Sequence, residues 1–139
     1  MAEKTFLAGY RLDGVDADKV FSWTLTNGGR EEVTVSTFEV SAKSGGWITI
    51  DVDGKSSGES VPPVDMTGKA ASRCEFRVAK AEPTGGVTLP LSMRLNVERF
   101  KWDQASITVA PGSSFTVIFT SDDALNESAC LMVYLEDLN

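Results

Sequence analysis

The sequence contains no histidine and only two cysteines. Histidine is the commonest general base and metal ligand, so its absence removes Ser-His and Cys-His nucleophile pairs. The paired glycines of the chain each open onto a strand pattern, whereas a phosphate-binding loop needs glycines that open onto a helix. Catalysis by carboxylates or lysine alone stays formally possible. The inventory nevertheless favours a protein that binds or assembles, not an enzyme, and one that needs no cofactor.

Long apolar runs and runs of basic residues are missing as well. No stretch approaches the roughly 18 apolar residues of a membrane span, and the segment MAEKTFLAGYRLDG has no signal-peptide core. The formal net charge is −7, and the 13 lysines and arginines are scattered along the chain. An acidic chain is poorly suited to a nucleic-acid backbone or an anionic membrane. We therefore expect a soluble chain that stays in a cytoplasm, with neither nucleic acid nor membrane as its partner.

The acidic residues and the cysteines admit simple structural explanations. Asp13-x-x-Asp16-x-Asp18 and Asp51-x-Asp53-Gly54 offer the oxygen ligands that calcium prefers, but neither matches an EF-hand loop. Aspartate and glycine are also the residues that turns favour, which accounts for both clusters. No metal site is therefore expected. Cys74 and Cys130 lie in apolar strand patterns and are typical of small buried hydrophobic residues. A disulfide between them would need an oxidising compartment, and the sequence leaves their redox state open.

What the sequence has in abundance is the alternation of β-strands. In Val20–Thr26, Phe21, Trp23 and Leu25 share one face, so this segment predicts a half-buried strand with Trp23 in the core. The apolar phase changes near Ser36-Thr37 within the strand predicted at 32–40, which indicates a β-bulge or a crossing between sheets. Such segments recur along the whole chain without helical periodicity. They predict one all-β domain over residues 1–139, an antiparallel β-sandwich or jelly roll of eight to nine strands.

Turn signals separate the predicted strands. Asn27–Arg30 and Asp53-Gly54 predict tight hairpins, and Pro111-Gly112 predicts the turn of a C-terminal hairpin. Residues 55–71 form one long irregular stretch interrupted by Pro62-Pro63, a length that is usually functional or flexible. Residues 1–10 are expected to form a first strand or an N-terminal arm.

The closing run Ala129–Leu135 is apolar on both faces. Such a strand is either central in the domain or covered on one face by another subunit. Trp47 falls in the outward phase of its strand, and exposed aromatic residues often anchor protein contacts or stack on sugars. We predict subunit contacts through Phe6, Tyr10, Trp47, Trp102, Met132 and Tyr134.

The last third, SITVAPGSSFTVIFTSDDALNESACLMVYLEDL, resembles small β-sandwich proteins of tailed-bacteriophage virions, in particular capsid decoration (cement) proteins. The resemblance implies a non-enzymatic virion structural protein that forms a homo-oligomer, typically a trimer, and binds the major capsid protein or another virion protein. It also implies assembly in the host cytoplasm and a place in the virion. No functional residue is transferred by it. The alternatives are a carbohydrate- or receptor-binding module of the phage-fibre or carbohydrate-binding type, and an accessory or inhibitory domain of an enzyme.

Overall fold

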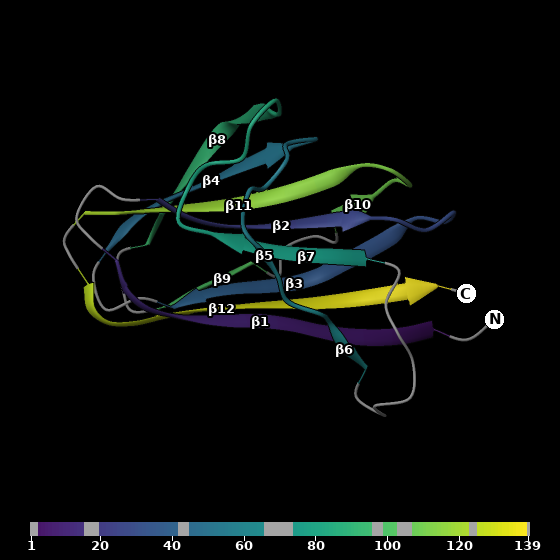
Figure 1. The fold of residues 1–139 in the computed structure, drawn as a ribbon, viewed down its shortest axis with the longest axis horizontal. Coiled ribbons are helices and arrows are strands. Elements are labelled where there is room, and N and C mark those ends of the chain that lie inside the picture. Colours follow the sequence, from purple (N-terminus) through teal and green to yellow (C-terminus); the bar gives the residue numbers. More distant parts are fainter. Residues whose placement is uncertain are drawn as a thin grey trace.

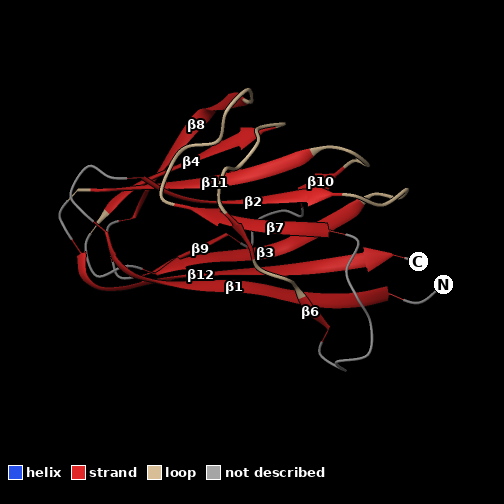
Figure 2. Ribbon diagram, in the orientation of Figure 1, coloured by secondary structure: helices blue, strands red, loops and turns tan. Residues whose placement is uncertain are grey.

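The computed structural model describes residues 3–15, 20–41, 45–65, 74–95, 99–102, 107–122 and 125–138, which form two facing β-sheets (Figures 1 and 2). The β12 sheet has the order β10 (Ile107–Val109), β3 (Val33–Ser41), β12 (Leu125–Leu138), β1 (Glu3–Val15) and β6 (Val64–Asp65), and β9 (Arg99–Trp102) also pairs with β3. The β11 sheet has the order β5 (Glu59–Ser60), β7 (Cys74–Ala79), β2 (Val20–Asn27), β11 (Ser114–Ser121), β4 (Gly46–Val52) and β8 (Val87–Leu95).

The predicted antiparallel β-sandwich is confirmed, since the paired strands run antiparallel in both sheets. The strand count is higher than the predicted eight or nine, because twelve strands are described. Two of them, β5 and β6, lie in the stretch that the sequence marks as irregular, on either side of Pro62-Pro63. Across the described ranges no helix is present, hence none of the length and apolarity that a membrane span requires.

No two strands that follow one another in the chain are paired with each other in the described structure. The hairpins predicted at Asn27–Arg30 and Asp53-Gly54 are therefore wrong. The first turn carries the chain from β2 in one sheet to β3 in the other, and the second leads away from β4 towards the far edge of the same sheet. Turn signals show where a strand ends, but they do not show which strand becomes its neighbour.

The Pro111-Gly112 turn forms, but the hairpin predicted there is wrong, because the turn connects the two sheets. The amide of Ser113 donates to the carbonyl of Ala110 at 3.0 Å, and Gly112 has a φ of 78°. Proline at the second position and a positive φ at the third define a type II turn. β10 lies in the β12 sheet and β11 in the other, so this turn is a corner of the sandwich.

Asn27 ties this corner to the neighbouring one. Its side chain is fully buried, and its Nδ2 donates to the carbonyl oxygens of Glu31 at 2.7 Å and Val109 at 2.9 Å. Its Oδ1 accepts from the amide of Gly29 at 2.9 Å. One amide side chain thus holds the β2–β3 crossing and the end of β10 in a fixed relation.

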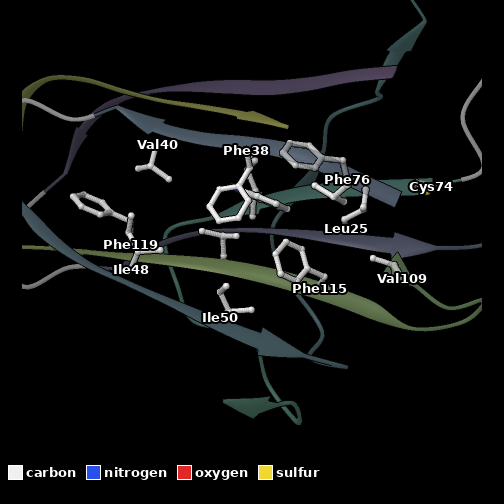
Figure 3. Packing of buried hydrophobic residues seen from close by; sticks show 14 of the residues in the cluster. Leu25, Phe38, Val40, Ile48, Ile50, Cys74, Phe76, Val109, Phe115 and Phe119 are labelled. Atoms are coloured by element: carbon white, nitrogen blue, oxygen red, sulfur yellow. The ribbon is translucent and has the colours of Figure 1, made fainter. Parts of the chain in front are cut away.

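The core lies between the two sheets and is aromatic at its centre (Figure 3). Trp23 is fully buried, as predicted, and its ring contacts Phe38 at 5.9 Å and Phe115 at 5.5 Å between centroids. Both ring pairs are edge-to-face, the geometry that aromatic quadrupoles favour. They connect Phe38 of the β12 sheet to Trp23 and Phe115 of the β11 sheet.

The predicted irregularity in β3 is a β-bulge. Tyr134 pairs with Thr37 and Leu135 with Val35, so Ser36 has no opposite residue in β12. Because Ser36 is an extra residue in the strand, the side chains of both Val35 and Phe38 point into the core, although the two residues differ in parity. Both side chains are fully buried.

The closing strand β12 is central in its sheet, because it pairs with β3 along one edge and with β1 along the other. The side chains of Ala129–Leu135 lie outside the described residues. Residues 3–10, expected to form a strand or an arm, belong to β1 and pair with β12 along their whole length. The first and last strands of the chain therefore lie side by side, as Figure 1 shows.

Two connections cross the outer face of the β11 sheet, drawn in tan in Figure 2. Residues 53–58 lead from β4 to β5, and residues 80–86 lead from β7 to β8, so both must pass β11 and β2. They pair with each other where Lys55 and Thr84 exchange backbone hydrogen bonds of 2.9 and 3.0 Å. Ser114 Oγ donates to the carbonyl of Gly54 at 2.8 Å, and Ser22 Oγ to that of Ala81 at 2.6 Å. We call residues 53–58 and 80–86 the crossing segments.

The crossing segments explain why polar residues in the outward phase of this sheet are buried. Thr24 and Thr116 are buried and share a hydroxyl–hydroxyl hydrogen bond of 2.8 Å. Asp51, beside Thr116 in the register, is only 7% exposed, and its Oδ1 has no hydrogen-bond partner among the described residues. The crossing segments therefore cover part of this face.

Candidate functional site

Trp47 lies at one open end of the outer face of the β11 sheet, near the edge that β8 forms. It pairs with Thr120 of β11 on one side and with Arg94 of β8 on the other. The side chain is 49% exposed, in agreement with the outward phase predicted for it. Among the described residues, the exposed large hydrophobic side chains are those of Trp47 and Val87, and both belong to the β4–β8 pair.

Arg94 and Asp122 hold the tryptophan in place. The Arg94 guanidinium lies 5.2 Å from the centroid of the Trp47 ring, within the range of a cation–π contact. The same guanidinium donates to both carboxylate oxygens of Asp122, with an Nη1–Oδ1 distance of 3.0 Å. Asp122 is itself fixed by its amide, which donates to the carbonyl of Gly45 at 3.0 Å. We call Trp47, Arg94 and Asp122 the Trp47 platform.

The ion pair shifts the protonation equilibria of both partners. The hydrogen bond from Arg94 lowers the pKa of the Asp122 carboxyl below its ordinary value, and desolvation opposes this only in part. The hydrogen bond to Asp122 likewise raises the pKa of the Arg94 guanidinium. Both side chains are about a third exposed to solvent, so the pair serves chiefly to orient the guanidinium over the ring.

The platform contains two residues that sequence reasoning did not select. These residues are Arg94 and Asp122. Their pairing joins residues 28 positions apart and depends on the unpredicted neighbourhood of β4 and β8. No local pattern in the sequence signals it.

The other predicted contact residues have different positions. Phe6 is fully buried in the core, so its selection as an exposed contact is wrong, because β1 is a strand of the sandwich and not a detached arm. The side chains of Tyr10, Trp102, Met132 and Tyr134 lie outside the described residues. Their backbones belong to strands of the β12 sheet, and Met132 and Tyr134 pair with Glu39 and Thr37 of β3.

A polar trough lies at the other open end of the same face. It has a volume of about 530 Å³, and Thr24, Thr26 and Ser114 form its floor. Glu75 and Arg77 of β7 line one side. Asp53 and Lys55 of the first crossing segment line the other. We call this site the polar trough.

Among the described residues no three potential metal ligands come together. Asp16 and Asp18 of the first carboxylate motif lie outside the described residues. Asp53 takes a left-handed turn conformation with a φ of 59°, which aspartate tolerates better than most residues. Cys74 is buried in the core, as predicted, and the side chain of Cys130 lies outside the described residues.

Comparison with known proteins adds little to this geometry. No protein-family model matches the chain, and no curated protein matches it significantly. Among solved structures, the capsid protein of BFDV in its decameric form is similar at 7% identity and a TM-score of 0.38, over 99% of both chains. The K1 cleaved adhesin domain of Lys-gingipain from Porphyromonas gingivalis W83 is similar at 9% identity and a TM-score of 0.27, over 94% of this chain and 63% of that one. Likenesses at this level do not determine a function.

Proposed function

We propose that this chain is a non-enzymatic virion structural protein of the capsid decoration type, and that it assembles through the β4–β8 edge of its β11 sheet. The observation that carries the proposal is the exposure of Trp47, whose side chain is 49% exposed beside Arg94 of the edge strand β8. A rigid tryptophan with an arginine over its ring has the composition of an interface centre, where tryptophan and arginine supply most of the binding free energy.

The β8 edge is suited to a closed assembly, not to open-ended strand addition. Pro90 lies within β8, and the register with β4 shifts between Thr49 and Asp51. Proline cannot donate a ladder hydrogen bond, and an irregular edge resists continuous pairing with another strand. Contacts at this edge would therefore be made by side chains, as in a homo-oligomer such as a trimer or against the major capsid protein.

The test is the molar mass in solution, measured by sedimentation or light scattering at micromolar concentration, together with co-sedimentation with purified tailed-phage capsids. We expect an oligomer or capsid binding that Trp47→Ala weakens. Thr108→Ala on β10 is a matched control, since Thr108 is exposed on the opposite sheet and should leave assembly unchanged. A monomer that ignores capsids would refute the proposal.

A carbohydrate- or receptor-binding module is the second candidate, and the half-exposed indole of Trp47 favours it. Sugar rings stack on aromatic faces, but here Arg94 already lies over the ring. Glycan-array binding that disappears in Trp47→Ala, in a protein that stays monomeric, would favour this function over assembly.

A further inference from the structure

The polar trough is a preformed cavity. Its β7 side is held by Arg77, which donates from Nη1 to the carbonyl of Gly58 at 2.8 Å and from Nε to Glu75. Its opposite side is held by Ser114, whose hydroxyl donates to the carbonyl of Gly54 at 2.8 Å. The Arg77–Gly58 and Ser114–Gly54 bonds attach the first crossing segment to the sheet at two points, and so fix the position of the segment that lines the trough. A volume of about 530 Å³ is in the range of small-ligand sites.

Several polar groups of the trough are not used in these bonds. Within the described chain, neither the Lys55 ammonium nor the Thr26 hydroxyl makes a side-chain hydrogen bond, and only one oxygen of Glu75 is engaged. The trough therefore presents a strong donor, a strong acceptor and a hydroxyl that can act as either. A ligand that satisfies all three must both donate and accept hydrogen bonds.

The charges of the lining select a neutral ligand. Lys55 and Arg77 are balanced by Asp53 and Glu75, and Arg77 is already paired with Glu75. An anion bound in the trough would be repelled by the carboxylates of Asp53 and Glu75. A cation would be repelled by Lys55 and Arg77. A neutral molecule experiences neither repulsion. Hydroxyl groups are both donors and acceptors and carry no charge.

We propose that the polar trough binds a neutral saccharide residue through hydrogen bonds to Lys55, Thr26 and Glu75. The site is independent of the proposed assembly role. It also differs from any sugar site at Trp47, because six residues of β11, about 20 Å, separate the levels of Ser114 and Thr120. None of the described lining residues is aromatic and could stack on a ring, so the dissociation constant for a monosaccharide should be on the order of 1 mM.

The experiment is an amide-shift NMR titration of the full chain with methyl glucoside, methyl galactoside and N-acetylglucosamine, and separately with glycine and inorganic phosphate. We expect at least one sugar to shift the amides of Thr24, Thr26, Lys55 and Glu75 in a saturable way, while Trp47 stays unshifted. Lys55→Met and Thr26→Val should each weaken binding by about three- to tenfold. Lys80→Met and Thr108→Val change exposed residues outside the trough and should leave binding unchanged.

Three results would overturn the proposal. They are the absence of saturable shifts with every sugar, preferential binding of glycine or phosphate, and sugar binding that Lys55→Met and Thr26→Val leave intact. Chemical-shift spectra of the variants without ligand show whether each is folded. Since Trp47→Ala should not alter this titration, failure of the trough and failure of the assembly proposal are distinguishable.

Discussion

Replacing Asn27 with alanine should destabilise the fold more than any exposed substitution, because one side chain joins two corners of the sandwich. The amide group makes three hydrogen bonds, to the carbonyls of Glu31 and Val109 and from the amide of Gly29, at 2.7 to 2.9 Å. Asn27 is fully buried, so water cannot replace these bonds without entering the structure.

The magnitude follows from those three bonds. Each neutral hydrogen bond contributes about 1 kcal/mol net, and a buried carbonyl left without a partner adds about 1 kcal/mol more. The Val109 carbonyl would lose its Asn27 partner at a buried site, so Asn27→Ala should lower the free energy of unfolding by about 3–4 kcal/mol. For a domain of this size that corresponds to a fall in melting temperature of roughly 10–15 °C. Asn27→Asp should cost more at neutral pH, since a carboxylate would face two carbonyl oxygens.

Urea denaturation followed by fluorescence and circular dichroism measures the difference directly. Thr108→Ala is the matched control, because Thr108 is exposed on the strand next to Val109 and its loss should change stability by less than about 0.5 kcal/mol. If Asn27→Ala lay within about 1 kcal/mol of the parent, the two corners would not be held by this side chain, and the reasoning would be refuted.

Four further predictions follow from the same structure. Gly58→Ala should cost about 1–3 kcal/mol of stability in urea melts, since its new Cβ would collide with the carbonyl oxygen of Val78; an unchanged melt would contradict this close approach. In an NMR titration the Asp122 carboxyl should show a pKa below the ordinary value, which Arg94→Gln should raise. The pair's small contribution to stability is then present above the unfolded-state pKa and is lost as the pH falls through the lowered folded-state pKa. Trp23→Phe should cost only about 1 kcal/mol, because the buried Nε1 has no hydrogen-bond partner in the described structure and removing it offsets part of the lost packing; a loss near that of a full truncation to alanine, about 3–5 kcal/mol, would contradict this. Refolding in stopped-flow experiments should take milliseconds to seconds, since every strand pair is non-local, and microsecond folding would be inconsistent with the topology.

The sequence predicted what depends on local periodicity. The inward residues of β2 and the buried apolar residues around the β3 bulge occupy the positions expected from alternation, because side-chain direction in a strand is set by the backbone alone. The type II turn at Pro111-Gly112 is local for the same reason. The class of the fold could be predicted to this extent.

Strand neighbours could not be predicted, and the errors share that cause. The hairpins expected at Asn27–Arg30 and Asp53-Gly54 would need consecutive strands to pair, which none of the described strands does. Phe6 appeared to be part of an exposed arm because its run is short and near the start of the chain. It is buried because β12, more than a hundred residues later, pairs with it.

The same limit applies to the candidate site, and the crossing segments show why. Alternation assigned Thr24, Thr116 and Asp51 to one face of their sheet, but it could not say what would cover that face. Because residues 53–58 and 80–86 pass over this face, these polar groups are buried. The Trp47 platform occupies one end and the polar trough the other, so two binding events can take place on one sheet without sharing a residue. Trp47→Ala should then alter assembly and leave the sugar titration unchanged, whereas Lys55→Met should do the reverse. If either variant changed both, the crossing segments would have to transmit the effect from one end of the face to the other.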